Sequence, residues 1–188
     1  MNLQKLFEMQ RKLDAHIEKE HPRQEGEDRL AKKILALQVE LGELANEWRG
    51  FKFWSHDQEP RYELYDEDEF SLLGDLFEQE YPLLEEYVDC LHFLLSIGLE
   101  LHVDPTEIKG FHERGSLIEQ FNAVFEFLSR FWSRVDKGFS YEEQVEYYVW
   151  TFKAFRVLGH MLGFKWEEIE QAYKEKNQVN HHRQEAGY

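Results

Sequence analysis

Five carboxylates in two stretches of the sequence have a spacing that suits metal binding. They are Glu40, Glu43 and Glu47 in ALQVELGELANEW, and Glu86 and Asp89 in LLEEYVDCLHF. An α-helix turns by roughly 100° per residue, so side chains three and four residues apart share one face. Each stretch therefore presents its carboxylates as a stripe beside its apolar residues, and no lysine or arginine interrupts either stripe.

The two stripes would meet if the two helices packed as antiparallel neighbours. Four or five bare carboxylates at one spot repel each other, and partial burial strengthens the repulsion. Protonation relieves it, and so does a hard divalent cation with oxygen ligands, for which Mg²⁺ is suited and Mn²⁺ is an alternative. A single Glu-x-x-Glu pair more often marks a solvated helix face. Two pairs on consecutive core-forming helices favour a metal site.

A second group of polar side chains lies in the segment YKEKNQVNHHRQEAGY, residues 173–188. Lysine offers a point charge, arginine a planar fork and asparagine an amide, and all three suit phosphate oxygens. A disordered, soluble tail would explain the polarity as well. The concentration of asparagine, arginine and tyrosine favours phosphate binding.

The segment RGFKFWS, residues 49–55, directly follows the first carboxylate stretch. Lys52 could meet a phosphate there, and Trp54 could form a wall for a planar base. The alternative is a hydrophobic corner that closes the bundle. We expect that second role for Phe51 and Phe53, whereas chemistry alone leaves both roles open for Lys52 and Trp54.

Apolar residues at helical spacing predict the elements that position these groups. We expect helices over residues 3–19, 28–48 and 82–101, a capped turn at DPTE, further helices beginning near 116 and 140, and a last helix that frays into a polar tail. Helix four is predicted to turn inward Leu117, Phe121, Val124, Phe125, Leu128 and Trp132. Residues 49–81 are the least regular, with a short helix at 71–80. The fold class is an all-α bundle of about six helices in one domain, residues 1–188.

Composition limits the classes of function. The chain has 188 residues and a formal net charge of −16, which argues against nucleic-acid binding through bulk electrostatics. Apolar runs are too short to cross a membrane, and the start of the chain is amphipathic rather than a signal peptide. Cys90 is the only cysteine, so a reducing compartment fits best. We expect a cytoplasmic protein.

Four motifs together resemble a known family. ELGELAN is followed by FKFWS, then by EEYVDCLHFLLSIG and finally by KNQVNHHRQEAGY. Their order and spacing resemble the dimeric all-α dUTP diphosphatases, within the all-α NTP pyrophosphohydrolase superfamily. The superfamily shares ExxE and ExxD, whereas FKFW and the terminal motif are specific to the dUTPase branch. The acidic residues 56–79 match none of these motifs.

The resemblance implies hydrolysis of dUTP to dUMP and pyrophosphate, with Mg²⁺, by a homodimer. Glu40, Glu43, Glu86 and Asp89 match the metal ligands, and Glu40 is the candidate for activating water. Lys176, Asn180, Arg183 and Tyr188 fall in the segment that closes over the phosphates, to which Lys52 is added. Gln10, Trp54, His92 and Phe93 are the candidates for contacts with uracil and deoxyribose.

Three rivals differ in testable ways. Another all-α pyrophosphohydrolase, acting on dCTP or a damaged base, would keep the carboxylates and change the base contacts. A non-catalytic protein that binds a basic partner through acidic helix faces would need no metal. A di-iron bundle would carry Glu-x-x-His motifs, which the two carboxylate stretches lack.

Overall fold

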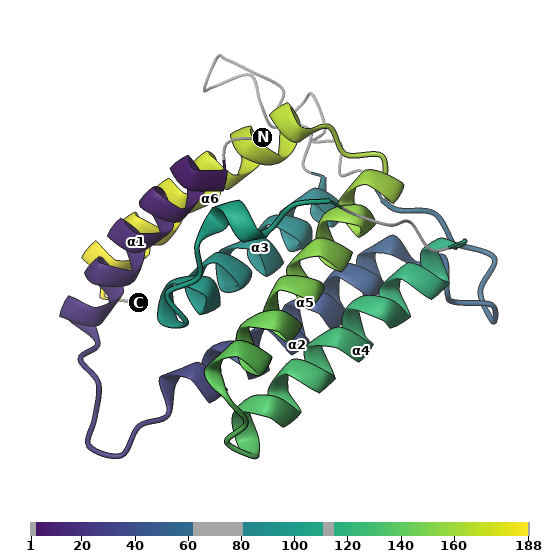
Figure 1. The fold of residues 1–188 in the computed structure, drawn as a ribbon. Helices are drawn as coiled ribbons and strands as arrows, with labels where there is room; N and C mark the ends of the chain where they lie inside the picture. Colours follow the sequence, from purple (N-terminus) through teal and green to yellow (C-terminus); the bar gives the residue numbers. More distant parts are fainter. Residues whose placement is uncertain (1–2, 62–80, 111–114, 188) are drawn as a thin grey trace, which may run out of the picture.

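The described part of the chain is built from α-helices. A computed structural model describes residues 3–61, 81–110 and 115–187, and none of these residues forms a β-strand. The helices in this part of the chain are α1 (Leu3–Glu20), α2 (Arg29–Trp48), α3 (Pro82–Glu100), α4 (Leu117–Asp136), α5 (Tyr141–Met161) and α6 (Trp166–Glu185), with a 3₁₀ turn at Pro105–Glu107 (Figure 1). The predicted all-α class is confirmed, and the expected helix at 71–80 lies outside the described residues.

Several helix ends follow the signals in the sequence. The Asp28 carboxylate accepts a hydrogen bond from the Ala31 amide at 2.9 Å, and Ser116 and Ser140 both form capping boxes. Gly163, with a φ of +90°, follows the end of α5 as predicted. The last helix differs from the expectation, because α6 stays helical through the polar segment to Glu185.

Burial on α6 explains why it does not fray. Ile169, Tyr173 and Asn177 are all buried and follow one another at four-residue intervals. They form a continuous inner stripe, and packing of such a stripe contributes more helical stability than residue propensity does.

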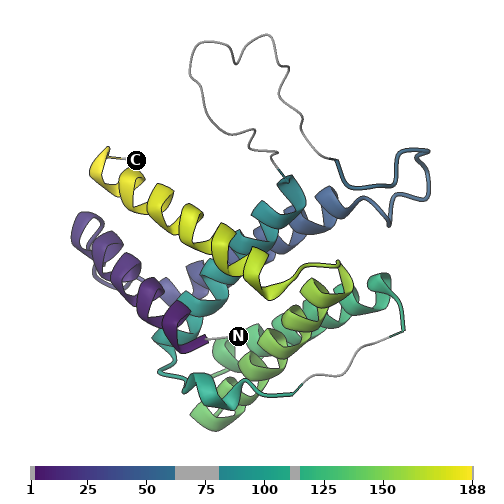
Figure 2. The ribbon, with the colours of Figure 1, turned by 90° about the horizontal axis from the view of Figure 1, so that it is seen from above.

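Helix α3 lies at the centre and contacts α1, α2, α5 and α6. Helices α2 and α3 are antiparallel neighbours, because Lys33 near the start of α2 pairs with Glu100 at the end of α3, at 3.0 Å. Helices α4 and α5 form a second pair on one side, as Figures 1 and 2 show. On the other side α1 and α6 run parallel.

The core follows the predicted faces with one exception. Buried residues include Leu6, Phe7, Leu37, Leu41, Leu44, Phe121, Val124, Leu128, Phe152, Phe155 and Leu158. On α4 the expectation for Phe125 is wrong: its side chain is 37% exposed, whereas Phe131 is buried. Among the helices that the structure describes, none is long and apolar enough to cross a bilayer.

Close packing at Gly98 of α3 leads to a stability prediction. A Cβ atom at this position would lie 2.9 Å from the Phe7 ring and closer still to the Tyr148 hydroxyl, which donates to the Leu94 carbonyl. We expect Gly98→Ala to lower the free energy of unfolding by about 1–3 kcal/mol, as overpacking does. Gly42 of α2 is the matched control, because a Cβ atom there meets nothing within 4 Å. Gly42→Ala should raise stability by up to about 1 kcal/mol through helix propensity. Urea denaturation measures both, and equal stability of the two variants would contradict the packing argument.

Candidate active site

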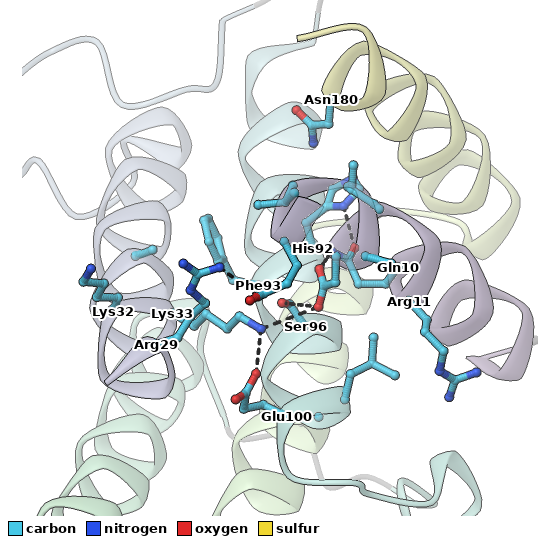
Figure 3. A pocket seen from close by; sticks show the side chains of 18 of the residues that line it. Gln10, Arg11, Arg29, Lys32, Lys33, His92, Phe93, Ser96, Glu100 and Asn180 are labelled. Atoms are coloured by element: carbon cyan, nitrogen blue, oxygen red, sulfur yellow. Dashed lines mark hydrogen bonds and ion pairs between the residues drawn. The ribbon is translucent and has the colours of Figure 1, made fainter. Parts of the chain in front are cut away.

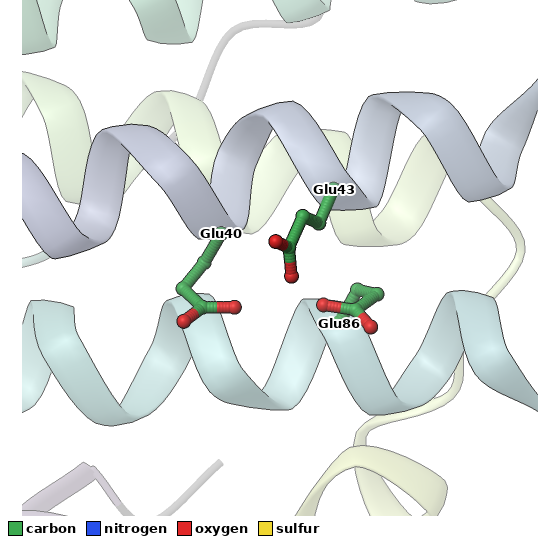
Figure 4. A group of neighbouring side chains, drawn as sticks. All are labelled: Glu40, Glu43 and Glu86. Carbon is green, nitrogen blue, oxygen red and sulfur yellow. The ribbon is translucent and has the colours of Figure 1, made fainter.

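Three carboxylates from two helices meet where α2 and α3 pack. Glu40 and Glu43 on α2 and Glu86 on α3 each offer one oxygen, and the three oxygens lie within 4.8 Å of one another (Figure 4). The spacing on α2 places its two glutamates on one face, and the antiparallel packing brings α3 opposite. The predicted meeting of the two stripes is confirmed for these three side chains.

The environment of Glu40 and Glu86 disfavours their charged forms. Burial, followed by the negative charges of Asp89, Glu43 and Glu40, raises the pKa of Glu86 to about 7. Burial and the charges of Asp89 and Glu43 also raise the pKa of Glu40. The Oε2 atom of Glu86 is buried and accepts no hydrogen bond from the described residues. A hard cation would supply both the missing charge and the missing partner, so these oxygens fit a divalent metal ion.

Asp89 is held differently from the other predicted ligands. Its carboxylate pairs with Lys176 Nζ at 2.7 Å, and the same ammonium group lies 2.6 Å from Glu85. Asp89 is near enough to raise the pKa values of Glu40 and Glu86 by charge repulsion. It therefore belongs to the same electrostatic cluster, with a lysine of α6 as its direct partner. Glu47, the last member of the α2 stripe, is not part of the group of three.

A cleft of about 1130 Å³ adjoins the carboxylates and is bounded by α1, α2, α3 and α6 (Figure 3). Glu40 and Asp89 lie on its wall. Five of the residues predicted to contact nucleotide also line it: Gln10, His92, Phe93, Asn180 and Arg183. The cleft thus joins the candidate metal ligands to side chains from both ends of the described chain.

A hydrogen-bonded network fixes the wall between α1 and α3. Gln10 Nε2 donates to Asp14 at 2.7 Å, so its Oε1 atom faces the Tyr173 hydroxyl and His92 Nδ1, each at 2.8 Å. Because an amide oxygen only accepts, His92 Nδ1 must carry the hydrogen. Ser96 Oγ donates to the second Asp14 oxygen at 2.7 Å.

His92 consequently has a defined tautomer. Burial, with a smaller effect from the charge of Lys176, lowers its pKa to about 3, so the ring is neutral. Its ring stacks on Tyr173, with centroids 4.2 Å apart. The Nε2 atom is an acceptor that is buried and bonded to none of the described residues. His92 therefore lines the cleft in one tautomer, with a buried acceptor that has no partner among the described residues.

Several predicted residues lie elsewhere. Lys52 and Trp54 do not line the cleft, and Trp54 is 65% exposed. The expected hydrophobic corner is also wrong, because Phe53 is 85% exposed and Phe51 is 39% exposed. Arg49 explains the change: it ends α2 in the left-handed region with a φ of 64°, so RGFKFW leaves the helix direction. Tyr188 lies outside the described residues.

The sequence reasoning missed Asp14, Ser96 and Tyr173. A signal was present for Asp14, which is four residues after Gln10 on the inner face of α1. Ser96 likewise follows His92 by four residues on α3. Small polar residues one turn away from a candidate ligand-binding residue on a core-facing helix were the available clue.

Comparison with protein families identifies a family to which the chain belongs. A family model described as dUTPase matches residues 2–70 and 78–188. No curated protein matches the chain. The matched ranges contain all the residues of the carboxylate group and the cleft discussed above.

Proposed function

The chain belongs to the dUTPase family and is a nucleoside triphosphate pyrophosphohydrolase that acts on dUTP, and we propose that this hydrolysis requires Mg²⁺ bound at the α2–α3 carboxylates. The observation that carries the metal assignment is the meeting of Glu40, Glu43 and Glu86, with an unpartnered buried oxygen, beside the cleft. Asp89 is the fourth proposed ligand. Residues 1–188 would act as one all-α unit, since α1, α2, α3 and α6 all line the cleft.

Magnesium, when bound, would polarise phosphoryl oxygens and offset the negative charge of the triphosphate. The four carboxylates would hold it. Glu40 is proposed to accept a proton from the attacking water, as a general base does. The water oxygen forms a bond to phosphorus while the bond between the α- and β-phosphoryl groups breaks, which releases dUMP and pyrophosphate.

The phosphates are proposed to bind the side of the cleft formed by α6. Asn180 and Arg183 line this side, and Lys176 lies one turn earlier on the helix against Asp89. An arginine fork and a lysine point charge provide charge-assisted hydrogen bonds to phosphate oxygens. Tyr188 and Lys52 are proposed as further phosphate contacts on the strength of the family motifs alone.

The base and sugar are proposed to bind near Gln10, His92 and Phe93. Uracil carries a hydrogen on N3, whereas the N3 atom of cytosine is an acceptor. The unpartnered His92 Nε2 acceptor can receive a hydrogen bond from uracil and would face a lone pair in cytosine. Buried polar groups that match one base and oppose another are an effective source of specificity. This supports dUTP over dCTP.

A homodimer is proposed as the working form. Exposed apolar side chains of α2 and of the segment after it support this: Leu35 is 61% exposed, Val39 51% and Phe53 85%. Apolar groups that gather on a surface commonly mark a protein contact. Trp54 belongs to the same segment, so its proposed contact with the base would depend on the assembled dimer.

Pyrophosphate release from a panel of nucleoside triphosphates, with Mg²⁺ and with EDTA, tests the proposal. We expect release from dUTP with Mg²⁺, little from dTTP or dCTP, and none with EDTA. Full activity in EDTA would reject the metal assignment. Release mainly from dCTP would reject the base contact and retain the carboxylate site.

The raised pKa of Glu86 predicts how stability depends on pH. Its pKa of about 7 lies above the ordinary value of 4.5, so between these values the folded state holds a proton that the unfolded state has lost. The contribution of Glu86 to the free energy of unfolding therefore falls as pH rises through this window. Burial lowers the pKa of His92 to about 3, which acts in the opposite direction up to about pH 6.5 in wild type and variant alike. We therefore expect the Tm of wild type in EDTA to fall relative to that of Glu86→Gln between about pH 5 and about pH 7.

Mg²⁺ should raise the Tm, mainly at the upper end of this pH range, because metal binding requires deprotonated ligands. Differential scanning calorimetry in EDTA and in Mg²⁺ measures both effects. A Tm that falls equally in wild type and Glu86→Gln would assign the pH dependence to other groups.

A further inference from the structure

Helices α1 and α6 lie side by side, and each carries a histidine followed four residues later by a glutamate. Lys5 contacts Glu170 at 3.3 Å and His16 contacts His181 at 2.9 Å, so the two helices advance in parallel. Each then carries a glutamate four residues after its histidine: Glu20 and Glu185. Side chains four residues apart share a helix face, so each glutamate lies on the same face of its helix as the histidine before it.

The two imidazoles already converge on one point. Their Nδ1 atoms are 2.9 Å apart, the ring centroids are 5.2 Å apart, and the ring planes differ by 26°. At this distance one ring must donate and the other accept, so both Nδ1 atoms face the same space. Burial and the neighbouring His16 lower the pKa of His181, which keeps its ring neutral, the form that binds metals.

The two carboxylates can join them with little cost. Glu20 pairs with its neighbour Lys19 at 2.8 Å, and Glu185 lies 3.7 Å from His182. Both are surface contacts, which contribute little stability. Lys19 is the main cause of the lowered pKa of Glu20, and the charge of His16 adds to it. Burial is the main cause of the lowered pKa of His181, and the charge of Glu185 opposes it, so each carboxylate is near the histidine on its own helix.

We propose that His16, His181, Glu20 and Glu185 form a second metal site, for Zn²⁺ or a similar late first-row ion such as Co²⁺ or Ni²⁺. Imidazole nitrogens suit these ions, whereas the all-oxygen group between α2 and α3 suits Mg²⁺. The two sites therefore differ in ligand chemistry and would be loaded by different ions. Binding would link the end of α1 to the end of α6, independently of nucleotide hydrolysis.

Titration of the whole, tag-free chain with Co²⁺ or Zn²⁺, in a large excess of Mg²⁺ to occupy the carboxylate group, tests this proposal. Co²⁺ is followed by its visible absorbance and Zn²⁺ by calorimetry. We expect one equivalent of either ion to bind and to raise the Tm. His16→Ala and His181→Ala should each weaken binding at least tenfold, whereas His182→Ala, whose side chain is 82% exposed, should bind as wild type does.

Circular dichroism verifies that each variant keeps its helices, and a double variant with Glu20→Gln and Glu185→Gln tests the ligands least involved in folding. This double variant should also bind more weakly than wild type. Failure of wild type to bind, or equal affinity in wild type and His181→Ala or in wild type and the double variant, would overturn the proposal. Loss of dUTP hydrolysis with intact Zn²⁺ binding would reject only the proposed function.

Discussion

Glu43→Gln is expected to lower kcat for dUTP by roughly 10³-fold or more while the helical fold stays intact. Glutamine keeps the size of the side chain and removes its charge. If Glu43 helps to hold the metal, its loss removes several kcal/mol of transition-state stabilisation, and each 1.36 kcal/mol is worth about tenfold in rate. The fold should not suffer, because the change removes a charge that repels Glu86 and raises its pKa. Steady-state pyrophosphate release and a thermal melt measure the two effects.

Glu47→Gln is the matched control for this experiment. Glu47 lies one turn further along α2 and is not part of the group of three carboxylates. It undergoes the same chemical change on the same helix. Activity near wild type in Glu47→Gln, with activity lost in Glu43→Gln, is the expected pattern. A wild-type kcat in Glu43→Gln would contradict the metal site and indicate that the α2 carboxylates only form a solvated face.

Arg183→Ala is expected to weaken binding of a non-hydrolysable dUTP analogue by roughly 10- to 100-fold. A hydrogen bond to a charged group contributes about 1.5–3 kcal/mol, and each 1.4 kcal/mol is about tenfold in Kd. Arg183 lines the cleft. Burial raises the pKa of Asp89, and the charge of Arg183 is among those that oppose this rise, so the guanidinium lies near the carboxylate end. Isothermal titration calorimetry in Mg²⁺ gives the Kd.

The control must remove the same charge at a distant place. Arg130 on α4 is exposed and pairs with Glu126 at 2.7 Å, away from the cleft. Arg130→Ala should therefore leave the Kd for the analogue unchanged. Similar losses in both variants would indicate a general effect of net charge, and no loss in Arg183→Ala would exclude this residue from the phosphate contacts.

Local rules in the sequence sufficed for the carboxylate group. Helical periodicity fixes the faces of Glu40, Glu43 and Glu86, and the apolar stripes beside them leave the two helices few ways to pack. The caps at Ser116 and Ser140 were readable because a capping box involves only four consecutive residues. These features depend on neighbours in sequence or on adjacent helices.

Other features depend on where a distant helix lies. The ion pair between Asp89 and Lys176 requires the position of α6 on α3, which no local spacing encodes. The polar composition of residues 173–185 suggested fraying, and only the burial of Tyr173 and Asn177 keeps them helical. On α4, Phe125 and Phe131 both fit a broad apolar face, and the position of α5 decides which one is buried.

The position of α6 also determines when the cleft can exist during synthesis. Helices α2 and α3, with the three glutamates, are translated before α6. The Tyr173 hydroxyl that binds Gln10 and the Lys176 ammonium that binds Asp89 are translated much later. A nascent chain thus carries the three glutamates before it has the lysine that pairs with Asp89 and the tyrosine that fixes Gln10 in the cleft wall.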